Sequence, residues 1–152
     1  MKIKFEIDEN IDEEEIIVKC KELTEDMMLL QRKITEAVNS KLKLQVIKGA
    51  KEYFINLEEI LFMETTGQYV AVHTKDAIYE TKQKLYELED LLLGSFMRVS
   101  KSTIINTGKI RSINKNITGA SEVEFGGTQK KAYVSRNYIK ALFSKLQEKR
   151  LG

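Results

Sequence analysis

From residue 42 onward, apolar and polar side chains alternate with the two-residue period that is typical of β-strands. The period is clear at Leu42, Leu44 and Val46, and further short strands follow closely with polar turns between them. Closely spaced short strands of this kind indicate antiparallel pairing. The predicted strands cover residues 42–46, 53–55, 60–64, 69–74, 78–81, 96–99, 103–106, 110–113, 121–125 and 130–134.

Two helices are predicted among and after these strands. The first has Leu85, Leu88 and Leu92 on its buried side, and Gly94 is positioned to end it. Ser135 can cap a second, terminal helix. The apolar face of that helix consists of Ile139, Leu142, Phe143 and Leu146. The predicted fold class is therefore mainly β with peripheral helices.

The first 40 residues follow a different pattern, which predicts a short β-β-α segment. Alternating residues predict strands at residues 3–7 and 16–20, separated by an acidic turn at 8–15. A helix is predicted at 24–38, with Thr24 as its cap. Its apolar stripe packs either on its own domain or on a second copy of the chain. The stripe consists of Met27, Leu30, Ile34 and Val38. We place the domain boundary between residues 1–40 and 41–152.

The composition excludes several classes of protein. The chain has 152 residues, 42% hydrophobic and 32% charged, which suits a globular protein. No apolar run is long enough to span a membrane, and the alternating N-terminus does not resemble a secretory signal. Cys20 is the only cysteine, so an internal disulfide is excluded. These observations predict a cytoplasmic protein.

Charge is distributed unevenly along the chain. Residues 1–40 carry 6 basic and 11 acidic side chains, whereas residues 95–150 carry 12 basic and 3 acidic ones. A basic C-terminal third is typical of a surface that binds a polyanion, although a solvated lysine-rich surface has the same composition. The acidic segment could lower the affinity for such a ligand. A deletion of residues 1–40 that left affinity and salt dependence unchanged would refute this idea.

The sequence provides poorly for catalysis, metals or cofactors. His73 is the only histidine, and no partner or nucleophile is evident beside it. One cysteine and one histidine cannot form the usual zinc site. No phosphate-binding glycine loop is present, and Gly126-Gly127 is more simply a hairpin turn. We expect no enzyme activity, no metal, no cofactor and no small-molecule substrate.

Nucleic-acid binding is better supported, because long cations are interleaved with short hydrogen-bonding side chains. Lys and Arg neutralise phosphates, while Ser, Thr and Asn fix the register on the duplex. Most aromatic residues alternate like core residues, which favours duplex DNA over stacking on RNA bases. The cations and polar residues are Arg98, Lys101, Lys109, Arg111, Lys115, Lys130, Lys131, Arg136, Ser100, Ser102, Thr103, Asn106, Thr107, Asn114, Asn116, Ser135 and Asn137.

Three segments of the chain resemble the LytTR DNA-binding domain of bacterial transcriptional regulators. Residues 56–70, NLEEILFMETTGQYV, are similar to the family's I-x-x-I-E-x-x-x-x-Y stretch. Residues 96–110, FMRVSKSTIINTGKI, are similar to F-x-R-x-H-x-S-x-x-V-N-x-x-x-I, and residues 133–138, YVSRNY, to V-S-R-x-Y. The resemblance covers about residues 43–147. The three segments together are specific evidence for the resemblance, because their order and spacing also match those of the family.

The resemblance implies an elongated fold of antiparallel strands that reads major grooves through loops. Three contact regions carry over: the loop at residues 66–69, Lys101, and Arg136. Arg136 is the first choice for a guanine contact, because its fork matches O6 and N7. The predicted DNA-binding residues are Gln68, Tyr69, Arg98, Ser100, Lys101, Ser102, Asn106, Ser135, Arg136 and Asn137.

Two departures from the family qualify these expectations. Ser100 stands where most members have histidine, which puts any histidine-dependent contact in doubt. The 40 residues before the domain are also too few for a phosphorylation receiver. The leading hypothesis is a stand-alone regulator that binds repeated half-sites as a homodimer. A small membrane-protein partner is implied by family analogy only. The alternative is a protein-interaction adaptor that binds an acidic partner through its basic surface and β-edges.

Overall fold

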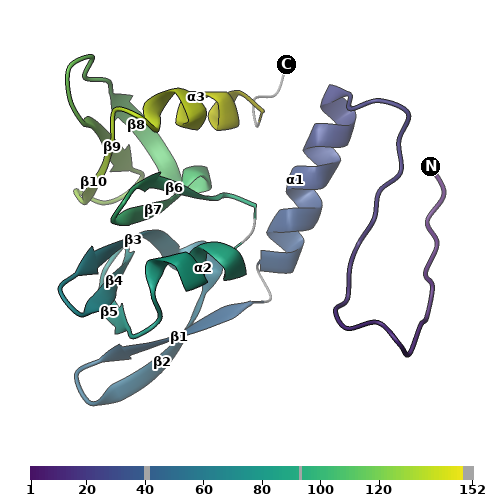
Figure 1. Cartoon of the computed structure of the whole chain (residues 1–152), viewed down its shortest axis with the longest axis horizontal. Coiled ribbons are helices and arrows are strands. Elements are labelled where there is room, and N and C mark those ends of the chain that lie inside the picture. Colours follow the sequence, from purple (N-terminus) through teal and green to yellow (C-terminus); the bar gives the residue numbers. More distant parts are fainter. Residues whose placement is uncertain (40–41, 93, 149–152) are drawn as a thin grey trace.

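A computed structural model describes residues 1–39, 42–92 and 94–148 of the chain (Figure 1). The predicted domain boundary at residues 40 and 41 lies outside the described residues. Helix α1 spans Glu25–Asn39, and the Thr24 Oγ1 accepts a hydrogen bond of 3.3 Å from the Met27 N–H. The predicted cap is therefore confirmed. No residue of α1 belongs to either hydrophobic core of the described chain.

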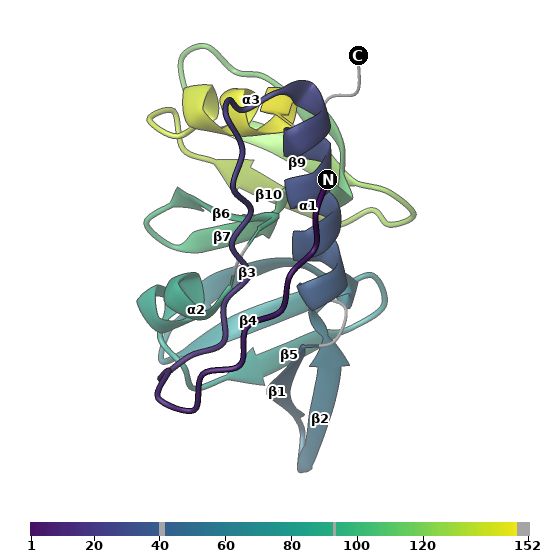
Figure 2. The ribbon, with the colours of Figure 1, turned by 90° about the vertical axis from the view of Figure 1, so that its right-hand side faces the viewer.

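The two strands predicted in the N-terminal segment are wrong. Residues 1–23 contain no strand, and their apolar side chains are exposed. The physical reason is that alternation only makes a strand possible, whereas a strand forms when a neighbour supplies hydrogen bonds and a surface to cover one face. In Figure 2 this segment runs along the outside of the molecule in front of α1.

Seven of the predicted strands form one antiparallel sheet, in the order β2-β1-β5-β4-β3-β7-β6. All pairings in the sheet are antiparallel, as expected from the short turns between strands. The bounds are β1 Lys43–Lys48, β2 Lys51–Asn56, β3 Ile60–Thr66, β4 Tyr69–Thr74, β5 Ile78–Thr81, β6 Phe96–Ser100 and β7 Thr103–Asn106, with short 3-10 helices at Leu57–Glu59 and Thr107–Lys109.

Helix α2, Leu85–Leu91, covers this sheet. Its side chains Leu85 and Leu88 are buried together with Leu92, as the sequence pattern predicts. They pack in one core with residues from several strands, including Met63 and Val72. Gly94 has a φ of 74°, a conformation that suits glycine and turns the chain towards β6.

Three further strands form a second antiparallel sheet, in the order β10-β9-β8. Its strands are β8 Ile110–Asn114, β9 Ser121–Phe125 and β10 Lys131–Val134, and helix α3, Ile139–Glu148, follows them. Leu142 of α3 is buried in a second core with Val123, Phe125 and Val134. Figure 2 shows the second sheet and α3 above the seven-stranded sheet.

A row of stacked rings connects the two sheets. Phe125 of β9 stacks on Phe62 of β3 with ring centroids 5.4 Å apart and an interplanar angle of 12°. Phe62 stacks in turn on His73 of β4 at 4.1 Å and 11°. Because Phe62 and Phe125 are both buried, this contact fixes the second sheet against the first. None of the described helices has the length and apolar character needed to cross a membrane.

Candidate nucleic-acid interface

Two backbone hydrogen bonds bring three distant chain segments to one place. The Thr65 N–H, at the end of β3, donates to the Ser102 carbonyl at 2.9 Å. The Ser135 N–H, just after β10, donates to the Val99 carbonyl of β6 at 2.8 Å. The β3–β4 hairpin, the β6–β7 hairpin and the junction between β10 and α3 are therefore neighbours.

The β3–β4 hairpin closes through a two-residue turn at Gly67-Gln68. Thr66 pairs with Tyr69 across this turn, and Gly67 has a φ of 61°. Glycine at the first central position with positive φ is typical of a type II′ turn, whose twist matches that of the flanking strands. The predicted site residues Gln68 and Tyr69 are both exposed at this turn.

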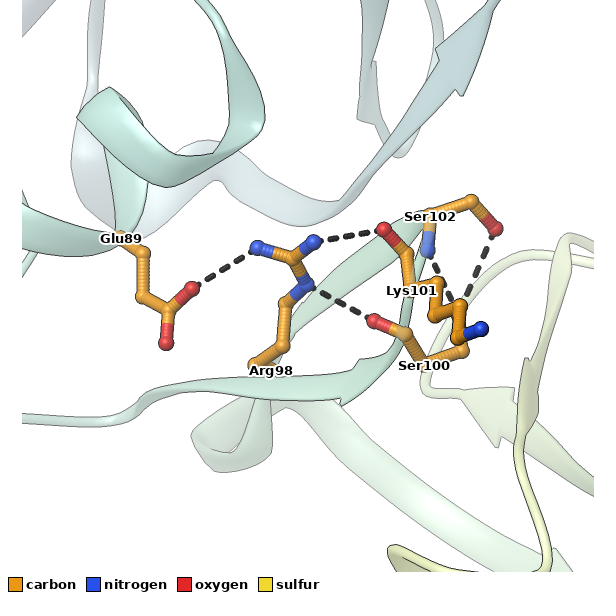
Figure 3. A network of polar contacts seen from close by, with 5 residues as sticks. All are labelled: Glu89, Arg98, Ser100, Lys101 and Ser102. Atoms are coloured by element: carbon orange, nitrogen blue, oxygen red, sulfur yellow. Dashed lines mark hydrogen bonds and ion pairs between the residues drawn. The ribbon is translucent and has the colours of Figure 1, made fainter.

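The β6–β7 hairpin is organised by Arg98 (Figure 3). Its Nε donates to the Ser100 carbonyl at 2.8 Å, and its Nη2 donates to the Lys101 carbonyl at 2.6 Å. Its Nη1 forms an ion pair of 2.8 Å with Glu89 of α2. The Ser100 Oγ accepts from the Ser102 N–H at 3.2 Å. Arg98 therefore holds the shape of the turn, while the exposed Lys101 side chain points away from Arg98 in Figure 3.

The segment between β10 and α3 differs from the prediction. Ser135 does not cap the helix, because α3 begins at Ile139. Instead the Tyr138 N–H donates to the Ser135 carbonyl at 2.8 Å and closes a turn. Arg136 and Asn137 are exposed within this turn. A turn presents both side chains at the surface, as the predicted helix start would have done.

An open hollow of about 470 Å³ lies where these segments meet. Four predicted site residues, namely Ser100, Ser102, Ser135 and Arg136, line it. The hollow is also lined by residues that sequence reasoning left out of the site: Glu64, Thr103, Thr118, Gly119, Ala120 and Tyr133. Several of the lining residues carry hydroxyl groups, which exchange hydrogen bonds with many polar ligands.

Two predicted site residues have structural roles. Asn106 is only 4% exposed, its Nδ2 donates to the Ile60 carbonyl at 3.0 Å, and its Oδ1 accepts from the Gly108 N–H at 3.1 Å. The structure therefore places Asn106 in the interior and away from the other site residues. Arg98 is likewise engaged in the hairpin that it organises.

Part of the basic C-terminal third is also engaged within the protein. Lys130 donates to the Ala77 carbonyl at 2.8 Å, and its desolvation there lowers the pKa of its amine. Lys131 forms an ion pair of 2.7 Å with Glu122, and this contact raises the pKa of Lys131. Among the cations of the predicted site, Arg136 and Lys101 form no ion pair with any residue in the described ranges, so both are available to an external anion.

Glu64, which lines the hollow, forms a polar pair with the buried His73. The His73 Nε2 lies 3.1 Å from the Glu64 Oε1, and His73 as a residue is 8% exposed. Since a carboxylate only accepts, Nε2 carries the proton in this contact. Burial, together with the nearby Lys130 charge, lowers the pKa of His73 despite the opposing effect of Glu64. The lowered pKa favours the neutral ring, which donates to Glu64 through Nε2.

The residues of the hollow that were absent from the predicted site differ in how far the sequence could have indicated them. Glu64 stands inside the first of the three family-like segments, so its proximity to the site was available from the sequence. Residues 118–120 carry no motif, and they reach the hollow only because Asn114 pairs with Glu122 and folds the β8–β9 loop back.

Comparisons with known proteins agree with this geometry. A sequence model of the LytTr DNA-binding domain matches residues 50–147. An uncharacterized HTH-type transcriptional regulator of Staphylococcus aureus (strain NCTC 8325 / PS 47) is 27% identical over 149 residues, which cover 96% of this chain and 98% of the relative. A second such regulator, from strain MSSA476, is 29% identical over 74% of this chain and 78% of the relative.

A solved structure gives the same fold. It is the LytTr DNA-binding domain of a protein described as a methyl-accepting/DNA response regulator from Bacillus cereus, with a TM-score of 0.64 at 20% identity. The match covers 70% of this chain and 97% of that domain. The chain belongs to the LytTR family of DNA-binding domains and is a non-enzymatic DNA-binding transcriptional regulator.

The name "HTH-type" of the relatives does not describe this fold. Strands separate α1, α2 and α3 along the described chain, so none of these helices follows another through a short turn. A recognition helix of the helix-turn-helix kind therefore has no counterpart among the described residues.

Proposed function

We propose that this regulator binds duplex DNA sequence-specifically through the face formed by residues 66–69, 100–103 and 135–137, hereafter the loop face. One observation carries the proposal: hydrogen bonds of Thr65 with Ser102 and of Val99 with Ser135 bring these segments together, and residues of the second and third segments line one hollow. Exposed turns with long cations and short hydroxyl side chains suit a groove and its flanking phosphates.

Each cation of the loop face has a different role. Lys101 stands at a hairpin tip that Arg98 holds rigid, and its flexible ammonium suits a phosphate. Arg136 lies in the wall of the hollow, and its planar fork suits the O6 and N7 atoms of guanine. The hydroxyl groups of Ser100, Ser102 and Ser135 fix the register against the backbone or a base edge.

Dimeric binding to two half-sites is part of the same proposal. A single small module has a modest contact area, so a second copy would raise affinity through the effective concentration of the pair. The apolar residues of the N-terminal segment support self-association, because they are exposed in the single chain and a second copy could cover them.

Selection of bound sites from a randomised duplex pool, followed by fluorescence anisotropy on the selected site, tests the proposal. We expect a motif with two repeats separated by about one helical turn, as two copies bound to one face of the duplex require. A motif with one half-site only would contradict dimeric binding. Failure to enrich any motif would contradict sequence-specific binding altogether.

Replacement of the proposed phosphate contact should weaken binding to every duplex by a similar factor. For Lys101→Ala we expect lower affinity for both the selected and the unselected DNA, and a salt slope that is shallower by about 1. Lys33→Ala is the matched control, because Lys33 is an exposed residue of α1, on the opposite side of Figure 1 from the β6–β7 hairpin. If both variants have the same salt slope, Lys101 does not contact a phosphate of the DNA.

A further inference from the structure

A carboxylate lies in the wall of the hollow, where the proposed function needs positive or neutral groups. Glu64 is the only acidic residue among the described residues that line the hollow, beside Arg136 and several hydroxyl groups. A negative charge at this position repels phosphates, so it opposes non-specific binding to any duplex. This cost is explained if the carboxylate makes a contact that depends on the base sequence.

The position of Glu64 is fixed by both of its neighbouring strands. It pairs with Ala71 of β4 and with Thr103 of β7, directly beside the β6–β7 hairpin. It is also two residues from Thr66, where β3 enters the turn of the β3–β4 hairpin. The carboxylate is thus carried by the sheet itself and not by a loop, which makes its placement more exact than a loop would allow.

His73 fixes the orientation of the carboxylate as well. Its Nε2–H donates to one Glu64 oxygen at 3.1 Å, and its ring is immobilised by the stack on Phe62. The Glu64 side chain is still 41% exposed, so the group remains available to a ligand. The His73 Nδ1 is buried without a partner in the described chain, as fits a ring that carries its single proton on Nε2.

A fixed carboxylate accepts hydrogen bonds and donates none, which limits the base edges that it can bind. In the major groove, thymine O4 and guanine O6 and N7 are acceptors, adenine presents its N6 donor beside the N7 acceptor, and cytosine presents the N4 donor without a neighbouring acceptor. The carboxylate therefore suits the amino group of cytosine best, because every other base places an acceptor near it. Arg136, in the same hollow, suits guanine. Arg136 thus suits the guanine of a G·C pair and Glu64 suits the cytosine. The two bases can belong to the same pair or to neighbouring pairs.

We infer that Glu64, in the hollow beside the loop face, is a specificity-determining residue that accepts a hydrogen bond from the N4 amino group of a cytosine. This inference rests on the proposed function and adds a second base contact to the one proposed for Arg136. His73 is a positioning residue, because it acts through Glu64 and is itself buried.

The test compares wild type with Glu64→Gln on the selected duplex and on single base-pair variants of it. The wild-type protein should prefer one C·G pair over T·A by about 5- to 150-fold, the range for one good base contact. Glutamine offers both a donor and an acceptor, so Glu64→Gln should accept either pair and lose most of this preference. Its binding to unselected duplex should become tighter, because a negative charge is removed.

Glu58→Gln is the matched control. Glu58 is an exposed acid just before β3, at the opposite end of the strand from the hairpin, and its replacement removes the same charge. It should leave every base preference unchanged. His73→Phe, which keeps a ring on Phe62 but removes the donor, should lower the cytosine preference by less than Glu64→Gln does. Thermal unfolding of each variant verifies that it is folded.

The outcomes separate this inference from the proposed function. If Glu64→Gln keeps all base preferences of the wild type and binds every duplex more tightly, Glu64 acts only through its charge and the inference is wrong. If its preferences change at a pair without cytosine, the assignment to N4 is wrong. If wild type binds no duplex in a salt-dependent manner, the proposed function fails and this inference fails with it.

Discussion

Replacement of Phe125 by alanine should lower the free energy of unfolding by about 3–5 kcal/mol, the range for truncation of a buried phenylalanine. Phe125 is 1% exposed in the second core, and its ring stacks on Phe62 between the two sheets. The substitution opens a cavity at this contact, so the surrounding strands lose both apolar burial and packing. Urea unfolding followed by circular dichroism measures the change.

Phe54→Ala provides the matched control, because the same atoms are removed from a surface position. Phe54 lies in β2 and is 63% exposed. Its replacement should change the free energy of unfolding by less than about 1 kcal/mol, mainly through strand propensity. Similar losses for the two variants would mean that Phe125 does not occupy the core contact that joins the sheets.

Replacement of Arg136 by alanine should cost about 1–3 kcal/mol of binding free energy on the selected duplex and relax the preference at one guanine. The loss is large because the guanidinium is exposed in the wall of the hollow, with its donors available to the groove. Fluorescence anisotropy on the selected site and on guanine variants of it measures both effects.

Arg136→Lys separates a base contact from a phosphate contact. Lysine keeps the charge but lacks the planar fork that binds O6 and N7 together. We expect this variant to retain most of the affinity for unselected duplex, while its guanine preference falls towards that of Arg136→Ala. A guanine preference equal to that of wild type would assign Arg136 to the phosphate backbone.

The strands after residue 42 could be predicted because alternation there coincides with closely spaced turns, so each strand has a partner a few residues away. The same alternation at Ile3, Phe5 and Ile7 predicted a strand that is absent. Periodicity reports which side chains could share a face, but it does not report whether another strand is present to complete the hydrogen bonds. The prediction therefore held only where local sequence also supplied a partner.

The interface was less predictable than the strands. Motif resemblance predicted Arg136 and Lys101 as contacts, but it did not predict the hollow, which depends on hydrogen bonds such as that between Val99 and Ser135. Asn106 illustrates a second limit of the sequence, which is that it cannot distinguish an exposed polar residue from a buried one. A polar residue among basic ones resembles a DNA contact in the sequence, yet its amide is buried against the Ile60 carbonyl. Pairing across the sheet, which a single sequence does not display, decides between the two roles.

Amide chemical-shift mapping by NMR, during titration with the selected duplex, tests the central claim most directly. The claim is that one loop face, assembled from three distant segments, meets the DNA. We expect the largest shift changes at residues 66–69, 100–103 and 135–137 together, with small changes along α1. Changes concentrated on α1 or on the β1–β2 hairpin, with the three segments unaffected, would contradict the claim.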